Sequence, residues 1–219
     1  SQIALYFNFD AGTALADESV EATINTNQLN VITNITSSGE LRIFTTASEF
    51  IVAQSFGEPI TPANLQVKVQ SQYGSKPGVP IEDLNGATVF VQRQGKSLIQ
   101  FQYTDSTNSY QSQTLSILSS HLVKSPTDLA IRRATSTDET DRLFLVNGDD
   151  GSMTVYSILL AQDVVAPSKF TTDGTFMAVG VEVSDVYTIV KRTVNSVVNY
   201  FLERFDSDLT LDSALTGGA

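Results

Sequence analysis

The chain has 219 residues and a formal net charge of −11, from 24 acidic and 13 basic residues. A nucleic-acid-binding surface needs clustered Lys and Arg to release counterions from phosphate, and no such cluster here exceeds two neighbours. No apolar run approaches the roughly 20 residues of a transmembrane helix. We therefore expect neither specific DNA binding nor membrane insertion. The absence of cysteine excludes disulfide bridges and thiolate metal sites.

Alternating apolar and polar residues predict β-strands along most of the chain. Clear examples are IALYFNF (3–9), LQVKVQSQY (65–73) and MAVGVEV (177–183). In the last of these, the predicted apolar face consists of Met177, Val179, Val181 and Val183. Charged residues make up only 17% of the chain, which is typical of neutral sheet surfaces and not of long solvated helices. The sequence predicts an all-β fold.

One or two short helices are expected between the strands. The segment SQTLSILSSHLV (112–123) has leucines at helical spacing after Ser112, a plausible N-cap. These leucines are Leu115, Leu118 and Leu122. The segment ADESVEAT (16–23) has weaker support. Turns are predicted at Asn85-Gly86, at Gln94-Gly95 and in NGDDGS (147–152).

A hairpin plan recurs four times, each time as an apolar run, a polar or glycine turn and an alternating return. The four segments are ELRIFTTASEFIV (40–52), ATVFVQRQGKSLIQFQY (87–103), DRLFLVNGDDGSMTVYSIL (141–159) and DVYTIVKRTVNSVVNYFLERF (185–205). Aligning Phe44, Phe90, Phe144 and Ile189 gives spacings of 46, 54 and 45 residues. Propeller blades recur at roughly 40–50 residues. An ordinary sandwich of unrelated hairpins is the alternative.

The predicted fold class is a partial β-propeller of four-stranded antiparallel blades. Four repeats are few for a closed propeller, so either the ring is partial or further blades lie outside this chain. The expected organisation is an irregular N-terminal β segment (1–37) that is a candidate part of the first blade, a propeller-like domain (38–213) and a flexible tail (214–219).

Several segments resemble the nozzle, or tail tubular protein B, family of short-tailed bacteriophages. The resemblance is carried by the order and spacing of segments over about residues 18–213. These segments are LRIFTTASEFIV, PITPANLQVKVQSQYGS, ATVFVQRQGKSLIQFQY and FTTDGTFMAVGVEVSDVYTIVKRTVNSVVNYFLERFDSDL. Family members are usually several hundred residues long, so the resemblance implies that this chain is only the central or platform part of such a protein.

The resemblance implies a virion structural protein and not an enzyme. Such proteins form a ring, typically of six subunits, beneath the portal and adaptor, and contact tail proteins and tail fibres. DNA passes through this conduit without specific binding. The expected location is the phage tail, after assembly in the host cytoplasm. A net charge of −11 suits a wall to which passing DNA should not adhere. No catalytic residue, cofactor or metal is expected.

Candidate residues for other chemistry have simpler structural explanations. His121 is the only histidine and is expected to border the short helix. Asn147, Asp149 and Asp150 could supply oxygen ligands to Ca²⁺, although a hairpin turn explains them equally. The acidic loops STDETD (136–141) and DSDLTLD (206–212) are expected to be solvated.

Other charged residues offer weaker candidate sites. Glu182 and Glu203 are the least implausible glycosidase pair, but alternation predicts that Glu203 points outward beside Arg204. Of Arg132 and Arg133, one is expected to form an ion pair between strands or subunits. YGSKPG (73–78) lacks the order of a phosphate loop and is expected to be a turn.

The alternative function is a module that binds a host glycan or receptor. Glycan sites usually stack sugars on exposed aromatic rings, and the chain has no tryptophan. Tyr73, Tyr103 and Tyr110, which lie near predicted loops, are the candidate residues.

Overall fold

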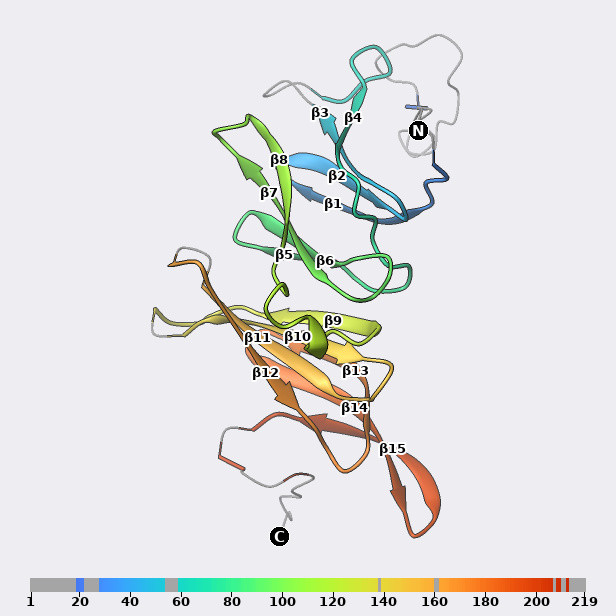
Figure 1. Cartoon of the computed structure of the whole chain (residues 1–219), viewed down its shortest axis with the longest axis vertical. Coiled ribbons are helices and arrows are strands. Elements are labelled where there is room, and N and C mark those ends of the chain that lie inside the picture. The colour runs from blue at the N-terminus through green and yellow to red at the C-terminus, as the bar shows by residue number, and fades with distance from the viewer. Residues whose placement is uncertain are drawn as a thin grey trace, which may run out of the picture.

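The computed structural model describes residues 19–21, 28–53, 59–137, 139–159, 162–206, 208–209 and 212. Its strands form four antiparallel sheets in chain order, and consecutive strands pair within each sheet (Figure 1). The first sheet contains β1 (Ile32–Ser38), β2 (Glu40–Thr45), β3 (Glu49–Ala53) and β4 (Gln66–Ser71). The second contains β5 (Glu82–Leu84), β6 (Ala87–Val91), β7 (Leu98–Thr104) and β8 (Ser109–Thr114). The third contains β9 (Pro126–Arg132), β10 (Asp141–Asn147), β11 (Met153–Leu159) and β12 (Val164–Phe170). The fourth contains β13 (Thr175–Glu182), β14 (Asp185–Val194) and β15 (Val197–Arg204).

The sheets stack face to face, with the first and fourth at opposite ends of the molecule (Figure 1). In the second sheet, Val89 and Val91 pack toward the third sheet, whereas Phe90, Ile99 and Phe101 pack toward the first. Successive side chains of a strand point to opposite faces, so a strand between two sheets must be apolar at consecutive positions. This requirement explains why residues 87–91 (ATVFV) form a nearly continuous apolar run in which every residue is buried.

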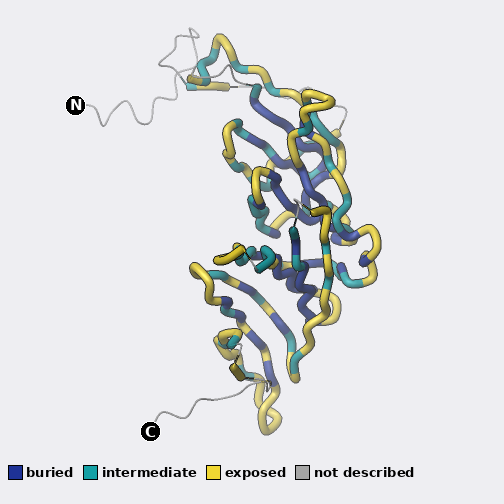
Figure 2. The backbone as a smooth tube through the Cα atoms, turned by 90° about the vertical axis from the view of Figure 1, so that its left-hand side faces the viewer, coloured by how far each residue is buried: buried dark blue, intermediate teal, exposed yellow. Residues whose placement is uncertain are grey.

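The third sheet has the same two-sided burial. Leu143 and Leu145 pack against the second sheet, and Phe144 and Val146 pack against the fourth. Figure 2 shows the buried backbone concentrated in the middle of the stack. Two layers of apolar side chains therefore join the last three sheets.

Equivalent strands of neighbouring sheets lie side by side, as expected for propeller blades. Among the first strands of the sheets, β5 contacts β9, and β9 contacts β13. The fourth strands β4 and β8 also contact each other. The all-β, propeller-like prediction is confirmed, and the four described sheets form an open stack and not a closed ring (Figure 1). Each of the four predicted hairpins forms the second and third strands of its sheet. The aligned residues Phe44, Phe90, Phe144 and Ile189 all lie in second strands.

The predicted turns connect these strands. Asn85 (φ 49°) and Gly86 (φ 85°) join β5 to β6 in the left-handed conformation that a two-residue hairpin requires. NGDDGS joins β10 to β11. In YGSKPG, Gly74 has a φ of 70°, and a Cβ there would lie 2.3 Å from the Thr46 carbonyl oxygen. This segment is a turn that packs closely on the first sheet.

The short helix predicted in residues 112–123 is present only as one turn of 3-10 helix (Ser120–Leu122), which follows the end of β8 and a turn, and Leu118 is 93% exposed. The apolar face predicted for residues 177–183 was wrong in part. Val183 has a φ of 56° in the β13–β14 turn and is exposed, so it leaves the apolar face of residues 177–183. Met177 lies at a bulge and is also exposed.

Some predictions lie outside the described residues, namely the strand at 3–9, most of the helical turn at 16–23 and the tail at 214–219. β1 crosses the expected boundary at residue 37 and belongs to the first sheet. Among the described residues, no helix is long and apolar enough to span a membrane.

A polar layer around Arg42 lies between the first and second sheets. The Arg42 guanidinium donates hydrogen bonds to Thr88 Oγ1 (2.7 Å), the Gly86 carbonyl oxygen (3.2 Å) and the Tyr110 hydroxyl (3.3 Å). It also lies 5.0 Å from the centroid of the Tyr110 ring and 3.6 Å from Asp83 Oδ1. Arg42 is 2% exposed, so this network fixes the two sheets together in a low-dielectric region.

Glu49 is a second buried polar residue of the first sheet. Its carboxyl accepts hydrogen bonds from the Ser71 hydroxyl and from the Tyr73 backbone N–H (3.2 Å). Its Oε1 has no hydrogen-bond partner among the described residues. Burial raises the pKa of Glu49 above its usual value of 4.5, and these hydrogen bonds offset only part of that effect.

We expect Glu49→Gln to change the pH dependence of stability. Because its pKa is raised in the folded state, wild-type Glu49 contributes stability at acidic pH that is lost as the pH rises through the folded-state pKa. The unfolding free energy of the variant, relative to wild type, should therefore increase between pH 4 and pH 8. Urea denaturation across this range measures the difference. Glu182→Gln removes an exposed carboxylate and controls for net charge. A difference that does not vary with pH would contradict the assignment.

Candidate interaction surface

The fourth sheet leaves one face without a neighbouring sheet among the described residues. We call this the outer face. Val186 and Val190 point to the opposite side and pack on the third sheet. Cross-strand pairing then fixes which side chains share the outer face. They include Ala178, Gly180, Glu182, Tyr187, Ile189, Lys191, Thr193, Val198, Tyr200, Leu202 and Arg204.

The centre of the outer face is apolar and exposed. Ala178, Ile189 and Leu202 form one row across the three strands. Leu202 is 74% exposed and Ile189 is 41% exposed. A Cβ built on Gly180 would contact nothing within 4 Å. Figure 2 shows exposed backbone at this end of the stack.

Comparison with the other sheets shows that exposure is unusual at this position. Phe44 and Phe144 also lie in second strands, point toward the next sheet of the stack and are buried, and the aligned Phe90 is buried against the preceding sheet. Ile189 is the equivalent residue of the fourth sheet, with no described sheet beyond it. The sequence repeat identified Ile189 but not its exposure. The sequence VVNYFLER of β15 did contain a signal for this surface, because apolar residues occur on both faces of the strand. An apolar residue on each face is unexpected in the last predicted strand, which has no later predicted strand to cover it.

Arg192 anchors the β14–β15 hairpin to the body of the protein. Its guanidinium donates to both carboxylate oxygens of Glu203 (2.8 and 2.9 Å), to Asp212 Oδ1 (3.0 Å) and to the Asp173 carbonyl oxygen (2.7 Å). The hydrogen bond from Arg192 lowers the pKa of Asp212 to about 2, despite its partial burial. The same partners raise the pKa of Arg192. The cluster holds the hairpin in a defined position.

The predicted orientation of Glu203 was wrong. Glu203 pairs with Thr188 on the inner face and forms its ion pair with Arg192, whereas Arg204 pairs with Asp206 (3.2 Å). Glu182 lies on the outer face at the end of β13. The two glutamates therefore project from opposite sides of the sheet and cannot flank one glycosidic bond.

Asp150 is neutralised by two lysines. Its Oδ2 accepts hydrogen bonds from Lys124 Nζ (2.8 Å) and Lys169 Nζ (3.3 Å), and its Oδ1 accepts from the Ser152 hydroxyl (2.5 Å). Partial burial raises the pKa of Asp150, but these hydrogen bonds outweigh burial and lower it. The carboxylate is engaged within the turn, and no group of three potential metal ligands occurs among the described residues.

The remaining charged candidates make local contacts. His121 lies in the 3-10 helix and is exposed. Arg132 forms an ion pair with Glu139 (3.2 Å), which lies in the loop between β9 and β10, so this contact is local and does not test the expected ion pair between strands or subunits. Arg133 donates to the Asp83 carbonyl oxygen (3.0 Å) and so connects the second and third sheets.

The three tyrosines do not form one exposed aromatic platform. Tyr73 and Tyr103 are 38% and 41% exposed, but Tyr110 is 5% exposed and stacks on Phe101 with ring centroids 4.9 Å apart. The structure uses Tyr110 to support Arg42 in the polar layer.

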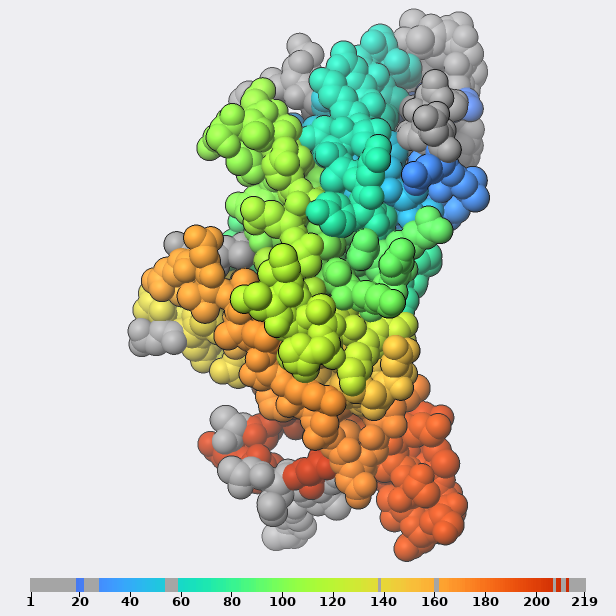
Figure 3. All heavy atoms as spheres, viewed as in Figure 1, coloured from blue at the N-terminus to red at the C-terminus, as the bar shows by residue number. Residues whose placement is uncertain are grey.

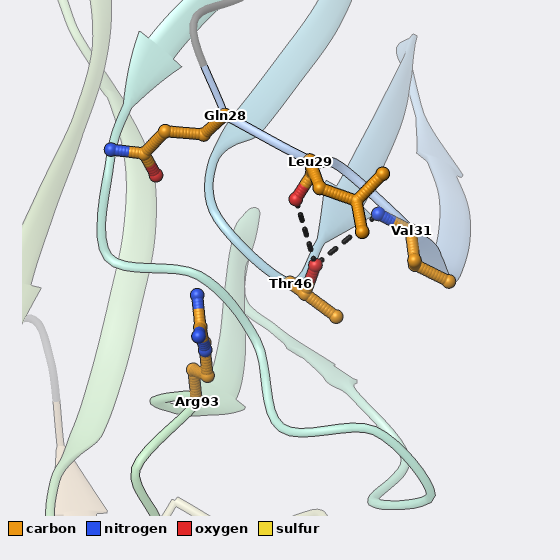
Figure 4. Close-up of a pocket in the computed structure, with 5 residues that line it drawn as sticks. All are labelled: Gln28, Leu29, Val31, Thr46 and Arg93. Atoms are coloured by element: carbon orange, nitrogen blue, oxygen red, sulfur yellow. Dashed lines mark hydrogen bonds between the residues drawn. The ribbon is translucent and has the colours of Figure 1, made fainter.

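An open pocket of about 660 Å³ lies beside the first sheet (Figure 4). It is lined by Gln28, Leu29, Val31, Thr46 and Arg93. The Thr46 hydroxyl accepts a hydrogen bond from the Val31 N–H (3.2 Å) and donates one to the Leu29 carbonyl oxygen (3.4 Å). These two bonds position the segment that leads into β1. Arg93 is the charged lining residue. Within the part of the chain that the structure describes, the lining combines one cation with no carboxylate, histidine or cysteine.

No family model matches this sequence, and no curated protein sequence matches it. Among solved structures, the chain is similar to the crystal structure of the N-terminal domain of Nup159. The TM-score is 0.45 and the sequence identity is 9%, over 79% of this chain and 43% of that chain. This chain therefore spans less than half the length of the structure it matches.

Proposed function

We propose that the chain is a structural subunit of a bacteriophage tail tube of the nozzle type, and that it assembles through the outer face of its fourth sheet. The observation that carries the proposal is the exposed row of Ile189 and Leu202, at a position where the preceding sheets are buried. Burying apolar area stabilises association by about 25 cal/mol per Å². A sheet from a neighbouring subunit would continue the stack.

The rest of the role follows from the resemblance of the sequence and from its charge. Six subunits would enclose a channel beneath the portal and adaptor, and the net charge of −11 would keep passing DNA from adhering to the wall. The polar layer and the two apolar layers would make each subunit a rigid wall segment. In this role the protein has no reaction to catalyse and needs no cofactor.

We expect Ile189→Asp to prevent ring assembly. A carboxylate at the centre of the outer face would have to be desolvated when the face is covered. Mass photometry and negative-stain microscopy should show rings of the wild-type chain and no rings of the variant. Val183→Asp is the matched control, because Val183 is 87% exposed in the β13–β14 turn and should tolerate the same substitution. A wild-type chain that stays monomeric up to its solubility limit would contradict assembly through this face.

The viral part of the proposal has a separate test. Antibodies against the chain should label the tail in immunogold images of purified virions. Labelling restricted to fibre tips would favour the receptor-binding alternative, and an absence of labelling would overturn the assignment to the virion.

A further inference from the structure

The fourth sheet has three described strands where the other sheets have four, and among the described residues no strand pairs with the outer edge of β15, which we call its free edge. The other third strands, β3, β7 and β11, have the apolar sequences EFIVA, LIQFQYT and MTVYSIL. The other fourth strands are polar at most positions or carry edge-protecting residues. These are β4 (QVKVQS), β8 (SYQSQT) and β12 (VVAPSKF). Lys and Pro are typical protectors of a free strand edge.

By composition, β15 is a third strand placed at an edge. Its sequence VVNYFLER carries neither Lys nor Pro, and apolar side chains occupy both of its faces. Val197 (58% exposed) and Phe201 (40%) are on the inner face, while Val198 (50%) and Tyr200 (64%) are on the outer face. An unprotected, apolar edge of this kind is a template for pairing with another strand.

The backbone register shows which groups are available at this edge. The Phe205 N–H donates to the Val186 carbonyl oxygen (2.9 Å), in the same ladder that pairs Val194 with Val197. In an antiparallel ladder, the residues between such hydrogen-bonded pairs direct their N–H and C=O groups away from the partner strand. The main-chain groups of Val198, Tyr200 and Leu202 therefore point to the free edge of β15.

We infer that β15 pairs antiparallel with β15 of a second copy of this chain, about a two-fold axis at Tyr200. This register places Tyr200 opposite Tyr200 of the second copy and Val198 opposite its Leu202. Each of these residues directs its main-chain groups to the edge, so both strands of the pair can be fully hydrogen-bonded. Their side chains also lie on one face, where aromatic and β-branched cross-strand neighbours stabilise a sheet.

Charge and shape favour a second copy as the occupant. The chain's net charge of −11 opposes close approach of two copies over most of the surface. At β15, residues 197–202 are uncharged, and Glu203 and Arg204 already have partners in Arg192 and Asp206. The β14–β15 hairpin also projects from the body of the protein (Figures 1 and 3), so two hairpins can meet edge to edge without a clash of the sheets behind them. The pairing is independent of the proposed ring.

The test compares two substitutions at Tyr200 by sedimentation equilibrium of the whole chain. Tyr200→Pro removes the edge N–H, which β14 does not use, and should raise the dissociation constant of the dimer by roughly a hundredfold or more. Tyr200→Thr keeps that N–H and should raise it by about tenfold or less. Circular dichroism checks that each variant is folded. Should Tyr200→Pro disturb the hairpin itself, Leu202→Lys provides a second disruption that keeps every main-chain donor.

The outcomes separate this dimer from the proposed ring. A dimer that persists in Ile189→Asp but is lost in Tyr200→Pro supports edge pairing, whether or not rings form. A wild-type chain that is monomeric up to its solubility limit overturns the inference. Equal effects of the proline and threonine substitutions would also overturn it, because the main-chain edge would then make no specific contribution.

Discussion

Phe144→Ala should lower the free energy of unfolding by about 3–5 kcal/mol, whereas Ile189→Ala should lower it by about 1 kcal/mol or less. Both residues occupy the second strand of a sheet and point toward the next position in the stack. Phe144 is 4% exposed because the fourth sheet covers it, and its truncation would leave a cavity. Ile189 is 41% exposed, so less of its apolar area is removed from water on folding.

Urea denaturation followed by circular dichroism measures both values. The two substitutions form a matched comparison, because each measures the loss of stability on truncating the aligned apolar residue of one repeat. A large loss for Ile189→Ala in the monomeric chain would show that the outer face is covered within the folded subunit, and would remove the basis for assembly through it. A small loss for Phe144→Ala would contradict the two-sided burial of the third sheet.

Arg42→Leu should lower the free energy of unfolding by about 3–5 kcal/mol. Leucine can fill part of the space, but it leaves the buried hydroxyls of Thr88 and Tyr110 without the donor that the guanidinium supplies. Buried acceptors that lose their partner retain their full cost of desolvation. The first and second sheets should therefore separate more readily than the apolar interfaces deeper in the stack.

Arg93→Leu is the control for loss of a guanidinium. Arg93 lies in the open pocket and is exposed, so its replacement should change stability by about 0.5 kcal/mol or less. Hydrogen exchange of β2 and β6 should rise in Arg42→Leu and stay unchanged in Arg93→Leu. A loss below about 1 kcal/mol for Arg42→Leu would indicate that water replaces the guanidinium in this layer.

The sequence determined the number of hairpins and their order. Alternation and turn residues act over a few neighbouring positions, and this is why the hairpins of residues 40–52, 87–103, 141–159 and 185–205 could be located without coordinates. Among the first and fourth strands of the sheets, β13 and β4 showed clear alternation, but β5 and β12 were harder to predict. β5 has only three residues, and β12 contains Pro167, so neither presents a long alternating pattern.

The local sequence pattern also failed to predict the environment of individual side chains. Glu203 was expected to point outward, but pairing with Thr188 places it on the inner face, within reach of Arg192. The leucines of residues 115–122 have helical spacing, yet no sheet receives Leu118, and the segment forms a turn. Glu203 is placed by contacts with the neighbouring strand β14, and Leu118 has no covering element, so in neither case did the local pattern encode the outcome.

The candidate surface likewise has properties that the sequence determines and properties that only the fold determines. The sequence alone determined that residues 197–202 are uncharged and, apart from Asn199, largely apolar, because composition is a property of the chain. Only the tertiary structure decided that this strand lies at a free edge and that Ile189 faces away from the third sheet. The physical reason is that a strand is apolar on both faces whenever both must be covered, but which neighbour covers each face depends on how sheets far apart in sequence stack.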